Sequence, residues 1–312
     1  MASESIQNCG YAECKKTTES TSLHKCTRCK KVAYCNKECQ TKAWPAHKKN
    51  CRRQNYIIKT QLSPGEVTDP PVFRTLSCPA HITFFQLHIG LQIAFGWALD
   101  HSFDFAVLNP DAEEPEHVQT QAEGRDASVP YPYLFHVINT WGSVFSDGDL
   151  RPRGKTHPNN PEKQADACVL HQLFDDPLYQ GRQIIYTYNF ASPWKHHMTI
   201  TGRAEATDEF VCLHGAGHGV AEDVGGVQGW ADLKAAYRAA NPSPDQRMRR
   251  HWFENICLNG DPVGLAGYRV NVWDKEVPDL IFQNKYICKK FKPDYDGIEK
   301  FLDDLRRSCG VI

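Results

Sequence analysis

Large apolar residues are sparse in the first 53 positions and dense afterwards, so the hydropathy pattern divides the chain into two parts. In the second part, short runs rich in β-branched and aromatic residues predict strands, at residues 56–62, 72–76, 103–108, 183–190 and 197–202. Strands precede most helices and do not alternate regularly with them. This order predicts an α+β fold rather than a doubly wound sheet.

Helices are predicted where apolar residues recur three and four positions apart. Thr83 and Gln86 match a capping box, which predicts a helix from there towards Gly96, with its apolar side chains on one face. Polar residues interrupt this apolar window, so we expect a buried amphipathic helix and not a membrane span. Further helices are expected at residues 230–241, after the cap residue Ser243, and at 293–307.

These patterns predict three segments: a small domain at 1–53, an α+β domain at 54–290 and a C-terminal helical segment at 291–312. Residues 109–130 and 147–163 are rich in proline and polar residues. We expect both to be exposed loops or disordered insertions.

Seven cysteines and one histidine form four closely spaced pairs in the first segment. They are Cys9 and Cys14, Cys26 and Cys29, Cys35 and Cys39, and His47 and Cys51. Eight such ligands make two tetrahedral zinc sites, one with four cysteines and one with three cysteines and a histidine. The spacing permits sequential or interleaved pairing. A disulfide framework is disfavoured by the histidine, the lysine-rich surroundings and the lack of a secretory signal pattern.

The first segment also needs metal to fold. It has too few large apolar residues to offset the entropy of ordering the chain, and units this small normally require a metal or disulfide. Structural zinc supplies on the order of 10–16 kcal/mol of apparent binding free energy, which becomes folding free energy.

Residues 9–51 resemble a MYND-type zinc finger, chiefly through the Cys35–Cys51 run with its Tyr34, Gln40 and Trp44. The first ligand pair, Cys9 and Cys14, departs from the family because four residues separate its cysteines. This spacing still lets both cysteines bind one ion. The resemblance implies interleaved pairing: Cys9, Cys14, Cys35 and Cys39 on one ion, and Cys26, Cys29, His47 and Cys51 on the other. It also implies a protein-interaction module that docks proline-containing peptides, with Gln40 and Trp44 in the groove; a simple packing role for Trp44 is the alternative.

Several phrases in residues 55–285 resemble a family named after the third open reading frame of a root-inducing plasmid. They include Gly96-Trp97 with His101, Tyr186 to His196, and Cys212 to Gly226. The resemblance implies a compact α+β fold and brings no established activity. Asn189, Ala191 and Ser192 stand where the family has Asp, Gly and Asp, and Val220-Ala221 replace a proline pair.

A metal-dependent hydrolytic site in the second domain is a further hypothesis, if its acid–base residues converge. The candidates are His101, Asp104, His196, His214, His218, Glu222 and Asp223. The alternative is a glycine-rich loop in which Glu222 and Asp223 cap a following turn or helix.

Charge is unevenly distributed. Residues 1–53 carry 12 Lys and Arg against 4 acids (+8), and the rest carry 24 against 33 (−9), which sum to the net charge of −1. A basic finger raises the possibility of nucleic-acid contact. However, its lysines are spread along the segment, and none of its helical patterns has the spacing of a DNA-recognition helix.

We therefore expect a non-enzymatic adaptor with two zinc ions and protein partners, located in the cytoplasm, the nucleus or both. A transcriptional or chromatin regulator is the alternative. The sequence phrases typical of SET-type methyltransferases are absent.

Overall fold

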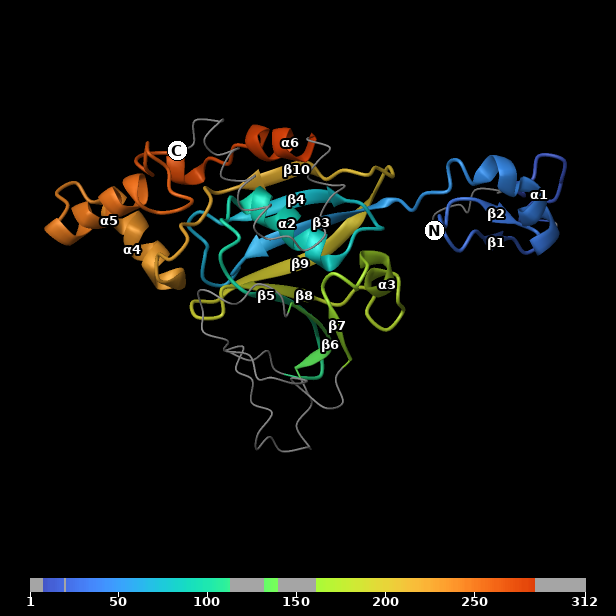
Figure 1. Cartoon of the computed structure of the whole chain (residues 1–312), viewed down its shortest axis with the longest axis horizontal. Coiled ribbons are helices and arrows are strands. Elements are labelled where there is room, and N and C mark those ends of the chain that lie inside the picture. Colours follow the sequence, from blue (N-terminus) through green and yellow to red (C-terminus); the bar gives the residue numbers. More distant parts are fainter. Residues whose placement is uncertain (1–7, 20, 113–131, 140–160, 284–312) are drawn as a thin grey trace. The chain divides into compact units, whose positions relative to one another are not determined.

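The computed structural model describes residues 8–19, 21–112, 132–139 and 161–283. It divides into two compact units, residues 1–55 with 203–207 and residues 56–202 with 208–312 (Figure 1). The predicted helix at 293–307 lies outside the described residues, as does most of the two predicted loops.

The first unit contains a short hairpin followed by one helix. Strands β1 (His24–Lys25) and β2 (Ala33–Tyr34) pair in antiparallel fashion, and helix α1 spans Lys37–His47. Asn36 caps α1 by accepting a hydrogen bond from the Cys39 N–H, which satisfies one of the helix's free N-terminal donors. The small hydrophobic cluster of this unit consists largely of cysteines with Tyr34 and Ala43, as expected for a fold held by metal.

The second unit is built on one eight-stranded sheet with the order β10-β4-β3-β9-β8-β5-β6-β7. Its strands are β3 (Asn55–Leu62), β4 (Phe73–Cys78), β5 (Phe103–Leu108), β6 (Tyr133–Ile138), β7 (Glu162–Gln164), β8 (Ile184–Tyr188), β9 (Trp194–Ala204) and β10 (Val211–Ala216). Neighbours pair in antiparallel fashion at β10–β4, β4–β3, β9–β8, β8–β5 and β5–β6, whereas β6 and β7 are parallel. This confirms the α+β class.

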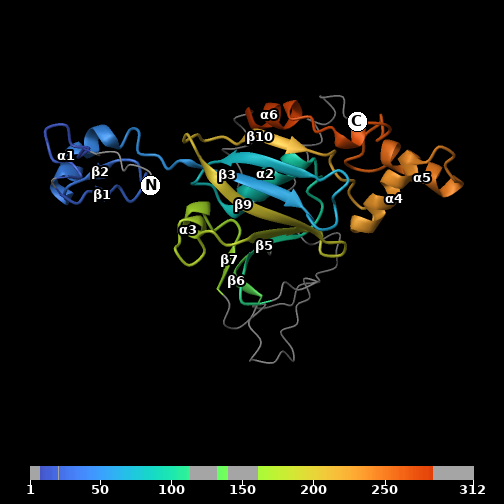
Figure 2. The ribbon, with the colours of Figure 1, turned by 180° about the vertical axis from the view of Figure 1, so that it is seen from behind.

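Helix α2 (Phe84–Phe95) is the centre of the core and packs against the sheet (Figures 1 and 2). The predicted capping box is present, and Gly96 ends the helix with φ of 76°, a conformation that costs glycine little. The helix is buried, as expected, but on all sides and not on one apolar face, because all residues of α2 except Gln86 are buried. The sheet and segments far away in sequence enclose the helix; Phe210, for example, lies against Gly90.

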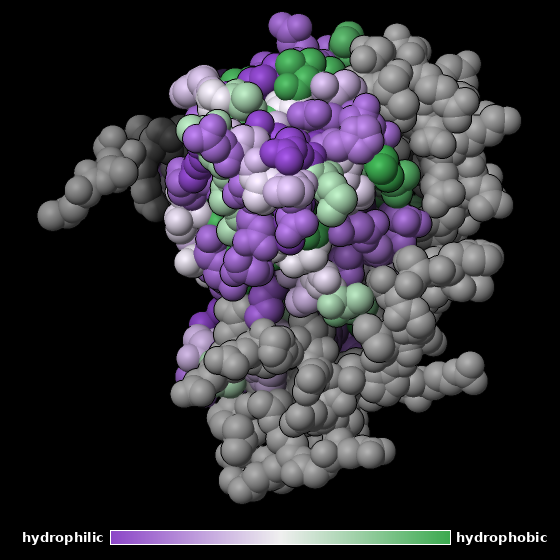
Figure 3. Space-filling model, turned by 90° about the vertical axis from the view of Figure 1, so that its left-hand side faces the viewer, coloured by the Kyte–Doolittle hydropathy of each residue, from purple (hydrophilic) through white to green (hydrophobic). Residues whose placement is uncertain are grey.

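The remaining helices are α3 (Leu170–Phe174), α4 (Gly226–Arg238), α5 (Pro244–Asn255) and α6 (Glu276–Gln283). Helices α4 and α5 lie side by side beyond one end of the sheet, and α6 lies near the edge strand β10 (Figure 2). On the face that Figure 3 shows, hydrophobic residues are scattered among hydrophilic ones. Among the described residues, no helix combines the length and apolar character needed to cross a bilayer.

Candidate functional site

The eight predicted zinc ligands gather into two clusters in the first unit. Cys9, Cys14, Cys35 and Cys39 form one, and Cys26, Cys29, His47 and Cys51 form the other. The pairing is therefore interleaved, and the sequential alternative is excluded.

The distances between ligand atoms fit tetrahedral zinc. Ligands 2.3 Å from a central ion lie about 3.8 Å from one another. In the first cluster, Cys35 Sγ is 3.9 Å from Cys9 Sγ, 3.7 Å from Cys14 Sγ and 3.5 Å from Cys39 Sγ. In the second cluster, Cys26 Sγ and Cys51 Sγ are 3.7 Å apart, and Cys29 Sγ is 3.6 Å from His47 Nε2. These residues hold two zinc ions.

The pKa values of the ligand thiols shift in both directions, downward for Cys9 and Cys26 and upward for Cys35, Cys39 and Cys51. Burial by itself raises the pKa of Cys26, but hydrogen bonds from the Cys29 backbone and the His47 side chain lower it to about 6. Zinc binds the thiolate, so groups that stabilise this form also favour coordination.

The two predicted groove residues lie one helical turn apart on α1. Gln40 is half-buried, and Trp44 is 38% exposed. The Trp44 ring lies 5.9 Å from the ring of the zinc ligand His47, measured between centroids. Coordination of His47 therefore helps to fix the position of the indole, while much of its surface stays accessible.

In the second unit, the seven candidate acid–base residues do not converge on one site. Asp104 faces His136 at 3.7 Å, the ring of His196 is fully buried, His214 lies on β10, and His218 pairs with Asp261 at 3.1 Å. Only His101, Glu222 and Asp223 come together.

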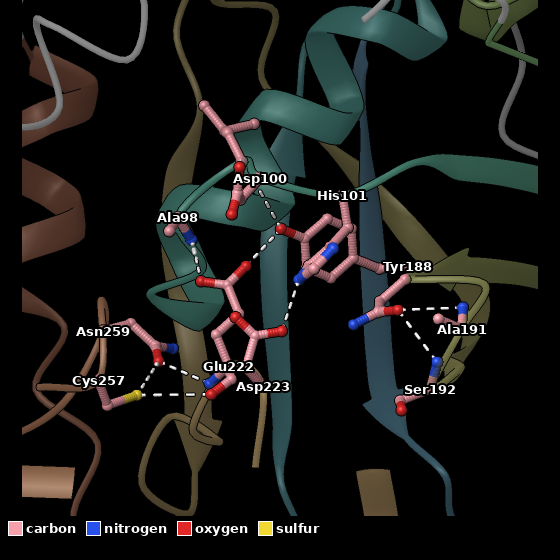
Figure 4. Close-up of polar contacts among 12 residues, drawn as sticks. Ala98, Asp100, His101, Tyr188, Ala191, Ser192, Glu222, Asp223, Cys257 and Asn259 are labelled. Carbon is pink, nitrogen blue, oxygen red and sulfur yellow. Dashed lines mark hydrogen bonds and ion pairs between the residues drawn. The ribbon is translucent and has the colours of Figure 1, made fainter. Parts of the chain in front are cut away.

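The segment after α2, the end of β8 and the turn before α4 meet around Glu222, whose side chain is buried (Figure 4). Its carboxylate accepts hydrogen bonds from the Ala98 N–H at 2.7 Å and from the Tyr188 hydroxyl. The Tyr188 oxygen in turn accepts from the Asp100 N–H at 3.0 Å. Burial and the nearby Glu222 charge raise the pKa of Tyr188 well above its usual value, so this hydroxyl stays a donor.

Glu222 and Asp223 lie in a turn and do not cap the helix that follows. Helix α4 begins at Gly226, and its N-cap Gly225 provides no side-chain hydrogen bond. Glu222 instead ties its loop to the end of α2, and Asp223 turns outward to the His101 ring, 3.0 Å away.

The turn after β8 has a structural role. Asn189 adopts a φ of 62°, and its side-chain oxygen accepts hydrogen bonds from the Ala191 and Ser192 N–H groups (Figure 4). The Asn189 side-chain amide thus closes the turn locally. Because Asn189, Ala191 and Ser192 replace the Asp, Gly and Asp typical of the family, this turn has no carboxylate.

Sequence reasoning also missed a cavity of about 510 Å³ at the C-terminal end of α2. Its wall includes the buried Arg74, whose guanidinium donates to the carbonyls of Phe73, Ala94, Ala216 and Gly217. Burial lowers the pKa of Arg74 to about 9. Other residues that line the cavity are Trp97, His218, Asp261, Arg269 and Trp273.

Fold and ligand geometry thus define a protein with a two-zinc finger and an α+β domain. Comparison with protein families agrees: residues 9–51 match the MYND finger, and residues 54–263 match the plasmid pRiA4b ORF-3-like protein family. The second match covers more than half of the chain, so the chain belongs to the pRiA4b ORF-3-like family and carries a MYND finger before the shared domain.

Individual relatives match parts of the chain. A SET and MYND domain-containing protein of Dictyostelium discoideum is 46% identical over 42 residues, which are 14% of this chain and 8% of that protein. A protein of unknown function from Methanosarcina mazei Go1 has a solved structure with a TM-score of 0.47 and 17% identity. That match covers 71% of this chain and 96% of the archaeal one.

Proposed function

We propose that the finger binds proline-containing segments of partner proteins on the face of α1 that carries Gln40 and Trp44. The observation that carries the proposal is the exposure of the Trp44 indole beside a zinc ligand. Proline-rich segments are already extended in solution and dock on exposed aromatic rings at a low entropic cost. Gln40, one turn earlier, offers both a donor and an acceptor to the backbone of such a peptide.

On this proposal the chain acts as a non-enzymatic adaptor. Both zinc sites of the finger are filled by four protein ligands, and such closed sites are structural. The finger then contributes recognition only. The use of cysteines as metal ligands and free thiols favours a cytoplasmic or nuclear location, which imaging of the tagged protein tests.

The test is a titration of the zinc-loaded full chain with a broad set of fluorescent proline-rich peptides. We expect Trp44→Ala to weaken binding of the best peptide at least tenfold while the zinc content stays at two ions per chain. Tyr268→Ala is the matched control, because Tyr268 is an exposed aromatic residue outside the finger. If no peptide binds, or if Trp44→Ala binds as well as the unchanged protein, the proposal is wrong.

A regulator that contacts nucleic acid directly is the second candidate, and the charge of +8 on residues 1–53 favours it. Phosphate contacts make such binding fall steeply with salt. Binding of the full chain to duplex DNA with a steep salt dependence supports this candidate. If the salt dependence is shallow, or if no DNA binds, the result favours protein partners instead.

A further inference from the structure

Asp100, His101 and Asp223 lie together on the surface of the second unit. One side-chain ligand atom from each falls within 4.8 Å of the other two. Asp100 and His101 follow the end of α2, and Asp223 precedes α4, so residues more than 120 positions apart in sequence meet here (Figure 4). Asp100 was not among the residues that the sequence singled out.

The histidine is held in place before any ligand binds. Its side chain is only 6% exposed, and its ring packs against Tyr188 with centroids 5.5 Å apart. Its Nε2 lies 3.0 Å from Asp223 Oδ1, so it points to the place where the carboxylates gather. This fixed imidazole distinguishes the cluster from an ordinary group of surface acids.

The two loops are joined beneath the cluster. Glu222 binds the Ala98 N–H, and the Tyr188 hydroxyl bridges Glu222 to the Asp100 N–H. These bonds are buried or partly buried, so the backbone next to all three cluster residues is fixed. Sites that hold their ligands in advance bind metal with a smaller loss of conformational entropy.

An open space adjoins the cluster. Asp223 lines a hollow of about 400 Å³ together with Arg249 and Trp252. The Asp223 side chain is 53% exposed. Water can therefore reach a cation that Asp223 holds and complete its coordination.

We propose that Asp100, His101 and Asp223 bind one divalent cation. Two carboxylates and one imidazole are ligands that suit Mn²⁺ and Zn²⁺. Three protein ligands leave coordination positions open, unlike the two closed sites of the finger. Binding requires the Nε2 lone pair of His101, so coordination to the cation replaces the hydrogen bond between Nε2 and Asp223.

The test uses Mn²⁺ with the zinc-loaded full chain, since Mn²⁺ prefers oxygen and nitrogen ligands and leaves the thiolates of the finger to zinc. Electron paramagnetic resonance of free Mn²⁺ gives the stoichiometry and affinity. We expect one bound Mn²⁺ per chain, with at least tenfold weaker binding in Asp223→Asn and in His101→Gln. Asp111→Asn, at an exposed aspartate outside the cluster, should bind as the unchanged protein does.

Asp100→Asn provides a second variant if the partly buried His101 cannot be replaced without unfolding, because Asp100 is exposed. Circular dichroism checks the fold of each variant. The proposal is overturned if the chain binds no Mn²⁺, or if the three cluster variants bind it as tightly as the control. Neither result depends on peptide binding by the finger.

Discussion

At the scale of single residues, the second unit is held by polar groups whose partners are distant in sequence. Glu222 reaches back 124 positions to the Ala98 N–H, and Arg74 reaches forward to Ala216 and Gly217. Burying such groups is costly unless each finds partners, and here carbonyls, amides and a tyrosine hydroxyl provide them.

Asp261 is the residue for which the structure predicts the clearest pH dependence. Burial opposes its charged form, but hydrogen bonds from His218, the Val263 N–H and Arg269 lower its pKa to about 2. An unfolded aspartate titrates at about 3.9. A carboxyl whose folded pKa is the lower one stabilises the fold above the unfolded value, and this contribution is lost as pH falls from about 4 to about 2.

We therefore expect Asp261→Asn to lower the free energy of unfolding near neutral pH by roughly 1 kcal/mol, a value reduced because Arg269 is partly exposed to solvent. The difference between variant and unchanged protein should shrink on going to about pH 2.5. Urea unfolding followed by the fluorescence of the buried tryptophans measures it. An equal difference at both pH values, or the same effect in Asp111→Asn, contradicts the assignment.

At the scale of elements, the sequence predicts those features that depend on residues close together in the chain. The Thr83–Gln86 pair placed the start of α2, and Ser243 placed the start of α5, because a capping box involves residues only three positions apart. The zinc ligands could be predicted for the same reason, since the two residues of each pair are close in sequence.

The elements that were missed depend on distant partners. Strand β10 contains Gly215, which has low strand propensity, and it forms because β4 pairs with it. The cluster of Asp100 with Asp223 requires the fold to bring two loops together, so no sequence spacing could indicate it. The apolar window of α2 indicated a buried helix, but the burial of its polar residues His88 and Gln92 depends on Tyr186, which lies 98 and 94 positions away in sequence.

The capping box of α2 gives a prediction at this scale. Thr83→Ala removes the hydroxyl that accepts the Gln86 N–H at 3.2 Å. We expect a loss of about 0.5–2 kcal/mol in the free energy of unfolding of the second unit. Denaturation by urea tests this, with the exposed Thr18→Ala of the finger as the control expected to change the second unit little. A loss below this range would mean that the cap does not hold the start of the helix.

At the scale of the whole molecule, the chain joins two units that are stabilised in different ways. The second has a large hydrophobic core beneath an eight-stranded sheet. The first has a cluster made mainly of its own zinc ligands. The sequence already contained this contrast, because the apolar residues begin where the cysteine pairs end.

Removal of metal should therefore affect the two units unequally. Structural zinc contributes its binding free energy directly to folding, so a strong chelator should unfold the finger. The core of the second unit contains none of those ligands and should persist.

The most direct test of this account is elemental analysis of the dialysed full chain, combined with its amide NMR spectrum before and after chelation. The account predicts two tightly held zinc ions per chain. It also predicts that chelation collapses the signals of residues 9–51 while those of the second unit remain dispersed. A protein without zinc, or a finger whose spectrum is unchanged by the chelator, would contradict it.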